Sequence, residues 1–213
     1  MEEPTAETLD SAIPIAELAA GRSVLVRGPA MSGKYDLLLR LLDALADHVL
    51  LVSTSRQATG ARADFAEYGD PDRFGIVDCA SRAQGRDGGE DALVRYASSP
   101  KNLTEIGVKF TDLVDTVQDD GVEHAAVGVH SVSELLMYWE TERVYQFLRV
   151  LLAEAQGLDW PAVAVVDDDA ATDQAVTTLT QPFDAVITTR RDDDGRAFRY
   201  QESGRELGDW TAF

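Results

Sequence analysis

Lysine is nearly absent from this sequence, and cysteine and long apolar runs are scarce too. The 213 residues include three lysines, Lys34, Lys101 and Lys109, beside 16 arginines. Cys79 is the only cysteine, so no disulfide can form within the chain. No apolar run reaches the roughly 18 residues that a membrane-spanning helix needs, and the start MEEPTAETLD is acidic where a signal peptide is basic. We therefore expect a soluble, cytoplasmic protein of a reducing compartment, with no membrane partner.

The second imbalance is in charge. The chain carries 38 acidic against 19 basic residues, a net charge of −19, and the excess is spread along its whole length. Such a surface repels nucleic acid, so we expect no nucleic-acid partner. It also repels itself in dilute buffer, whereas at 1 M salt the Debye length is only about 3 Å. Together with the scarcity of lysine, this composition favours a halophilic archaeal protein over an acidic mesophilic one.

Short apolar runs alternate with helical patterns along the chain. We predict strands at residues 23–28, 48–53, 74–79, 125–130 and 161–166, each a continuous apolar run typical of a buried strand. Helical spacing falls at 35–46, 61–68, 106–117, 132–139, 144–155 and 170–179. This order predicts an α/β fold with a mostly parallel sheet covered on both faces.

The C-terminal part predicts a different connection. Runs at 183–188 and 197–201 flank Asp194-Gly195, a strong signal for an antiparallel hairpin at the end of the sheet. We expect one domain over residues 1–213, with a lead-in at 1–20 that contains one short helical turn. Residues 82–104, rich in glycine, serine and charge, are expected to form a long irregular loop.

One motif carries recognisable chemistry. Residues 28–34, GPAMSGK, match the first seven positions of the phosphate-binding P-loop, G-x-x-x-x-G-K, between a predicted buried strand and a predicted helix. In such a loop the backbone N–H groups and the helix N-terminus face phosphate oxygens, and the lysine reaches the outer phosphates. The candidate nucleotide-binding residues are Gly28, Pro29, Ala30, Met31, Ser32, Gly33, Lys34 and Tyr35.

Tyr35 departs from the motif. The eighth position is normally Ser or Thr, whose hydroxyl ligates the magnesium that bridges the phosphates. A phenol on a rigid ring cannot take that place without moving the metal or swinging away. The N–H cradle and Lys34 remain compatible with ATP binding, but the usual Mg²⁺ site is not expected, and no residue is assigned as a metal ligand.

With these residues the chain resembles the KaiC-like branch of the RecA-type P-loop ATPases, in particular its short haloarchaeal members. The resemblance covers nearly the whole chain and rests on the P-loop and three further runs: SVSELLMYWETERVYQFLRVLLAEAQ, AVVDDDAATDQAVTTLTQPFDAVITTR and DWTAF. It implies a three-layer RecA-like fold and ATP as the ligand. Because RecA-type domains commonly associate side by side, it also implies a protein partner or a homo-oligomer.

The resemblance further implies that catalysis is weakened. Active members carry a glutamate just past the second strand, where this chain has Ser55 and Arg56, and an aspartate at the end of the fourth strand, where it has His130. Phosphoryl transfer depends on positioning and charge stabilisation by such groups. Together with Tyr35, three positions differ from the pattern of the active members. We therefore expect a nucleotide-binding regulatory or signalling protein without efficient hydrolysis, and we assign no catalytic residue.

Two other functional interpretations stay open. The chain could be an active ATPase that recruits Asp36 or the Asp167–Asp169 cluster, or an interaction module with a relic P-loop. The cluster Asp167–Asp169 follows a strand end, where α/β proteins bind ligands, but a solvated loop is the simpler interpretation. For His130 we favour a structural role over one as a ligand or base. Cys79, within an apolar run, is expected to be buried and unreactive.

Overall fold

The computed structural model describes residues 9, 11–86, 89, 91–193, 195–202 and 207–213. Within these residues, nine strands form one sheet in the order β4-β3-β2-β5-β6-β1-β7-β8-β9. The strands are β1 (Ser23–Gly28), β2 (His48–Ser53), β3 (Phe74–Asp78), β4 (Val94–Tyr96), β5 (Ala125–His130), β6 (Ala162–Asp167), β7 (Ala185–Asp192), β8 (Gly195–Glu202) and β9 (Thr211–Ala212).

Strands β1 to β7 pair in parallel, whereas β8 runs antiparallel to β7, and β9 antiparallel to β8. The α/β class, the mostly parallel sheet and the C-terminal antiparallel hairpin predicted from the sequence are therefore confirmed. The expected turn residue Asp194 lies outside the described residues.

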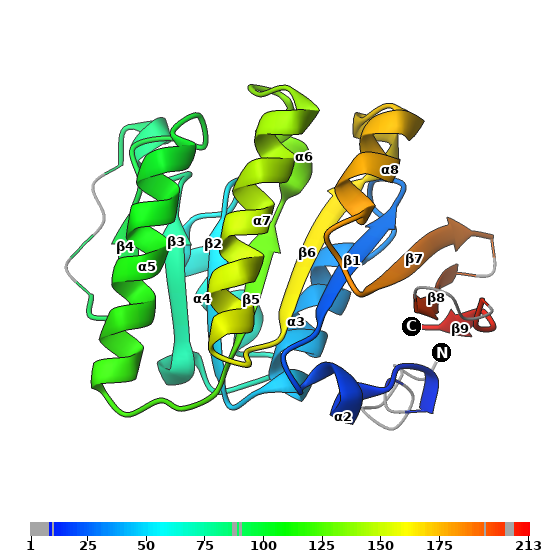
Figure 1. Ribbon diagram of the computed structural model, residues 1–213, viewed down its shortest axis with the longest axis horizontal. Helices are drawn as coiled ribbons and strands as arrows, with labels where there is room; N and C mark the ends of the chain where they lie inside the picture. The colour runs from blue at the N-terminus through cyan, green and yellow to red at the C-terminus, as the bar shows by residue number, and fades with distance from the viewer. Residues whose placement is uncertain (1–8, 10, 87–88, 90, 194, 203–206) are drawn as a thin grey trace.

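Helices cover both faces of the sheet (Figure 1). The helices are α2 (Ile15–Leu18), α3 (Lys34–Leu45), α4 (Ala58–Phe65), α5 (Leu103–Asp119), α6 (Val132–Leu136), α7 (Thr141–Gly157) and α8 (Asp173–Thr180). Helices α5 to α8 pack on one face over a core that includes Phe110 and Leu148. Helices α2 to α4 pack on the other over Leu38 and Phe65. The central strands β1, β2, β3, β5 and β6 are largely apolar because both of their faces are buried.

The structure corrects three expectations about local structure. The stretch 82–104 is not wholly irregular, since it holds a 3₁₀ turn, η2 (Arg82–Gln84), and the edge strand β4, which pairs in parallel with β3. Helix α4 begins at Ala58 rather than at 61, because the Ala58 N–H donates to the buried Asp78 carboxylate at 2.7 Å. Strand β9 was not foreseen, since two residues carry no periodicity.

Parallel pairing brings distant strand ends to one edge of the sheet. In the register of β1 and β6, Gly28 lies beside Asp167, and in that of β2 and β5, Ser53 lies beside His130. Open α/β sheets bind ligands at this edge, beyond the carboxyl ends of their strands. The fold therefore places the glycine-rich loop, the β5 end and the β6 end together.

Candidate functional site

The Gly28–Lys34 loop joins β1 to α3 through three residues with positive φ. Gly28 has φ 152°, Met31 62° and Gly33 86°. A Cβ at Gly28 would overlap the hydroxyl and carbonyl of Thr189 on β7. A Cβ at Gly33 would come within 2.8 Å of Arg196 Cδ and 3.0 Å of the Phe213 ring. Both glycines of the motif are therefore required by close packing as well as by backbone conformation.

Lys34 is turned into the loop, with 4% of its surface exposed. Its Nζ donates to the Gly28 carbonyl at 2.9 Å, to the Pro29 carbonyl and to Ser32 Oγ at 3.2 Å. Asp167 Oδ1 at the end of β6 lies 2.8 Å from the same nitrogen. A buried ammonium needs such partners, because leaving it without them would cost several kcal/mol. The amine is thus held by oxygens of the loop itself, and its charge is balanced by Asp167.

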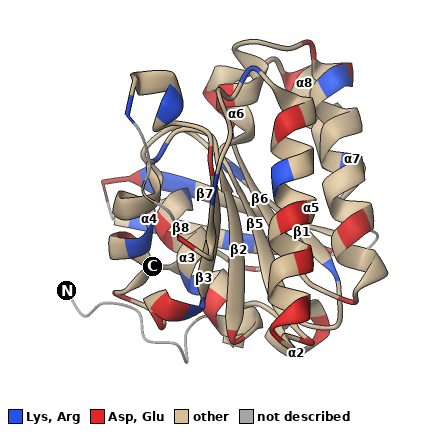
Figure 2. Cartoon of the chain, turned by 90° about the vertical axis from the view of Figure 1, so that its left-hand side faces the viewer, with Lys and Arg blue, Asp and Glu red and all other residues tan. Residues whose placement is uncertain are grey.

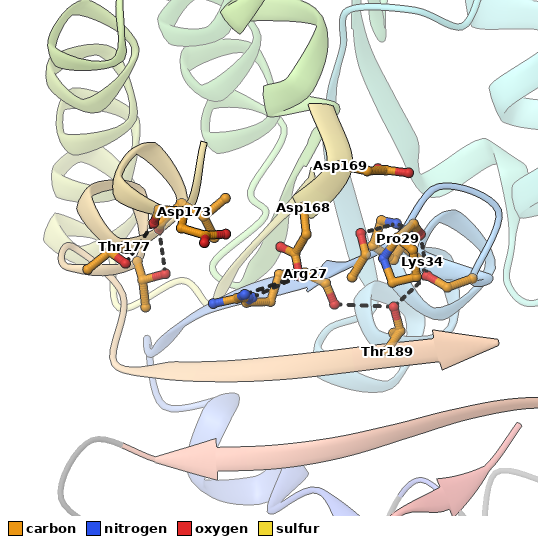
Figure 3. Close-up of polar contacts among 12 residues, drawn as sticks. Arg27, Pro29, Lys34, Asp168, Asp169, Asp173, Thr177 and Thr189 are labelled. Carbon is orange, nitrogen blue, oxygen red and sulfur yellow. Dashed lines mark hydrogen bonds and ion pairs between the residues drawn. The ribbon is translucent and has the colours of Figure 1, made fainter. Parts of the chain in front are cut away.

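Asp168 and Asp169, which follow β6, also bind residues of β1 and of the loop (Figure 3). Asp168 forms an ion pair with Arg27 of β1 at 3.1 Å. The Ala30 N–H, an amide of the loop itself, donates to both Asp169 oxygens at 3.1 and 3.2 Å. The three carboxylates remain partly exposed, as a solvated loop predicts, but each also binds a group on β1 or on the loop that follows it.

Arg56, Tyr35 and His130, the three positions at which the sequence departs from the pattern expected of an active ATPase, pack in one cluster. The Tyr35 and His130 ring centroids are 4.5 Å apart, and the Arg56 guanidinium lies 4.0 Å from the Tyr35 ring centroid. The Tyr35 hydroxyl donates to Asp64 at 3.1 Å, and Arg56 donates to the same carboxylate at 2.6 Å. The sequence analysis singled out Tyr35, Arg56 and His130 one at a time. The structure shows that the three side chains form one cluster.

This environment shifts the protonation of both rings. Burial, followed by the nearby Arg56 charge, lowers the pKa of His130 to about 4. Burial and the Asp64 carboxylate raise the pKa of the Tyr35 phenol. At neutral pH both rings are therefore uncharged, so the cluster contributes one formal positive charge, that of Arg56. The Ser55 hydroxyl lies 3.4 Å from His130 Nδ1.

We predict that His130 makes stability pH-dependent. Its pKa of about 4 in the fold lies below the unfolded value of 6.5, so the unfolded chain binds more protons between these values. Above pH 6.5 the free energy of unfolding is unaffected by the protonation of His130. As pH falls from 6.5 toward 4, the free energy of unfolding decreases by about 2 to 3 kcal/mol. Urea unfolding at a series of pH values measures it, with His130→Gln as control. Parallel pH curves for the two proteins would contradict the prediction.

A cavity of about 360 Å³ opens beside the loop. It is lined by Met31, Gly33, Lys34, Tyr35, Asp36, Arg56, His130, Val165, Asp167 and Arg196. Of the expected loop residues, the structure places Met31, Gly33, Lys34 and Tyr35 on this cavity. The sequence analysis did not identify Arg196 on β8 as a residue of this cavity. The sequence of a hairpin does not indicate which of its residues will face a loop more than 150 residues away in the chain.

The residues present do not fit a magnesium ion. A Mg²⁺ site needs oxygen ligands in near-octahedral geometry. The Tyr35 oxygen is directed to Asp64, and His130, which also lines the cavity, offers nitrogen rather than oxygen. Across the part of the chain that the structure describes, no group of three His, Cys, Asp or Glu side chains is arranged to hold a metal.

The solved structures that share this fold include two archaeal proteins. PH0186, a KaiC-like protein from the hyperthermophilic archaeon Pyrococcus horikoshii OT3, matches 91% of this chain and 83% of its own with a TM-score of 0.56 and 11% identity. PH0321 from Pyrococcus horikoshii, crystallised in complex with an unknown peptide, matches 85% of this chain and 83% of its own with a TM-score of 0.58 and 16% identity. No curated protein matches the sequence.

These likenesses define the class: the chain has the KaiC-like, RecA-type α/β fold. More narrowly, a family model matches residues 21–189, so the chain belongs to a family of unknown function (DUF7504). The matched region includes the glycine-rich loop, the Asp167–Asp169 cluster and most of β7. None of the described helices is both long and apolar enough to cross a membrane.

Proposed function

We propose that this protein binds a nucleotide, with ATP as the first candidate, at the Gly28–Lys34 loop and serves as a regulatory or signalling module without efficient hydrolysis. The observation that carries the proposal is the buried Lys34 amine, which is held by the loop and by Asp167 and lines a cavity of about 360 Å³. A lysine in this position of a G-x-x-x-x-G-K loop is suited to the outer phosphates of a nucleotide.

The packing of Tyr35, Arg56 and His130 supports the second half of the proposal. Hydrolysis needs a group that orients or deprotonates the attacking water and a centre that stabilises the charge on the transferred phosphoryl group. Arg56 cannot accept a proton, and no carboxylate stands at either position where the family has one. Binding without turnover fits a protein that reports nucleotide to a partner, either another protein or a second copy of this chain.

The test is an ATP titration in about 3 M KCl, where the charge repulsion is screened. We expect saturable binding that Lys34→Ala weakens by about a hundredfold, the effect of removing a buried charge-assisted contact of roughly 3 kcal/mol. Lys101→Ala, which removes an exposed lysine, is the matched control. Phosphate release should stay at background in all three proteins. Turnover that disappears in Lys34→Ala would overturn the non-hydrolysing half.

A specific observation favours the relic interpretation as the second candidate. The packing around Gly28 and Gly33 would preserve both glycines even if no ligand bound. In that case the turn between α6 and α7, where Met137 is 71% exposed, is the surface to consider for a protein partner. ATP binding that depends on Lys34 separates the two candidates.

The remaining alternative, an active ATPase with substitute carboxylates, has less support. Asp36 lies 3.5 Å from Arg40 and accepts a hydrogen bond from Tyr68, and Asp167 is paired with Lys34. Both candidates for a metal ligand are thus engaged with side chains of the fold.

A further inference from the structure

Two arginines, Arg56 and Arg196, line the cavity beside the loop, whose lining does not fit a magnesium ion. We infer that Arg56 and Arg196, rather than a magnesium ion, neutralise the phosphates beside Lys34, so that this site takes a nucleotide polyphosphate free of metal. The inference rests on the proposed function and specifies the charge state of its ligand.

Arg56 reaches the cavity from the loop after β2. Its guanidinium lies against the Tyr35 ring and forms an ion pair with Asp64 at 2.6 Å. A guanidinium has five N–H donors in a rigid fork, and the carboxylate contact uses only part of them. The ring contact and the ion pair fix the orientation of the fork, which lowers the entropy lost when the other donors bind phosphate.

Arg196 reaches the same cavity from the opposite side, on β8. Its side chain lies over the Gly33 backbone, and the Phe213 ring packs beside it. None of the ion pairs among the described residues involves Arg196. Its guanidinium is exposed beside the cavity and can bind an anion there, and arginine is the preferred side chain for phosphate oxygens.

The charges that face the cavity explain why arginines are needed there. Lys34 is paired with Asp167, and Asp36, which also lines the cavity, lies near Arg40. Lys34 alone would therefore leave a polyphosphate beside two carboxylates in a protein with a net charge of −19. Arg56 and Arg196 add positive charge on either side of the lysine, and neither requires the oxygen ligands that the site lacks.

The experiment is a titration with fluorescently labelled ATP in about 3 M KCl, once with excess EDTA and once with excess MgCl₂. We expect dissociation constants that agree within about twofold. Arg56→Gln and Arg196→Gln should each weaken binding about tenfold, the usual loss for one charge-assisted contact. Arg149→Gln removes an equal charge from the exposed side of α7, far from the cavity, and should leave the affinity unchanged.

The outcomes separate this inference from the proposed function. Binding that requires Mg²⁺, or wild-type affinity in Arg196→Gln, overturns the arginine assignment and leaves nucleotide binding in place. No saturable binding under either condition overturns both. Thermal unfolding of each variant identifies a folding defect, and because Arg196 is exposed on a hairpin, its replacement tests the inference even if Arg56→Gln disturbs the Tyr35 ring.

Discussion

Replacing Asp78 with alanine should lower the free energy of unfolding by about 4 kcal/mol, because three backbone donors and one hydroxyl lose a charged acceptor. The carboxylate is fully buried at the end of β3. It accepts hydrogen bonds from the amides of Ala58 (2.7 Å), Ala80 and Ser81 (both 2.8 Å) and from the Ser81 hydroxyl (2.6 Å). These bonds join the start of α4 to the end of β3, and a loss of this size is a large part of a typical stability of about 5–15 kcal/mol.

Chemical denaturation at high salt measures the effect. Asp119→Ala is the matched control, since it removes the same charge from an exposed position in the last turn of α5 and should change stability by less than about 0.5 kcal/mol. Equal unfolding midpoints for the two variants would show that the Asp78 network contributes little.

Transfer from about 3 M to about 0.1 M KCl should lower the thermal unfolding midpoint by about 10 °C or more. Acidic residues recur along the helices (Figure 2), and Asp112, Asp115 and Asp119 are exposed on α5. At the lower concentration the Debye length is about 10 Å, so like charges on neighbouring turns and neighbouring helices repel one another. The unfolded chain separates these charges and is therefore favoured.

Circular dichroism during heating measures the midpoint. Choline chloride at the same ionic strength should restore it as KCl does if screening is the cause, whereas an uncharged osmolyte should restore less. A midpoint that is independent of salt between these concentrations contradicts the prediction and removes the physical basis for a halophilic origin.

The strands of the central sheet could be predicted from the sequence because each buries both of its faces and so forms an unbroken apolar run. Two strands could not be predicted. Strand β4 has three residues and β9 has two, too few to show a period, and both are specified by their partners in the sheet. The start of α4 was placed late for a related reason, since its N-terminal amide is satisfied by Asp78, twenty residues further along the chain.

The same limit applies to the candidate site. The loop and Tyr35 are visible in the sequence because the G-x-x-x-x-G-K pattern fixes their places, whereas Arg56 and His130 were singled out only through the family resemblance. Their mutual packing is not visible, since it depends on the register of β2 and β5. The approach of Arg196 to Gly33 depends on the register of the β7–β8 hairpin, which no local pattern encodes.

The hydrogen bond from Ala30 to Asp169 has a thermodynamic consequence for any anion that arrives at the loop. Such a ligand does not meet a bare amide; it exchanges with a carboxylate tethered to the adjacent strand, and that carboxylate must then be hydrated again. Breaking the Ala30–Asp169 hydrogen bond offsets part of the favourable binding free energy, so the affinity for an anion is lower than the N–H donors alone would give. In return, the tether holds the backbone in its curved shape between one ligand and the next.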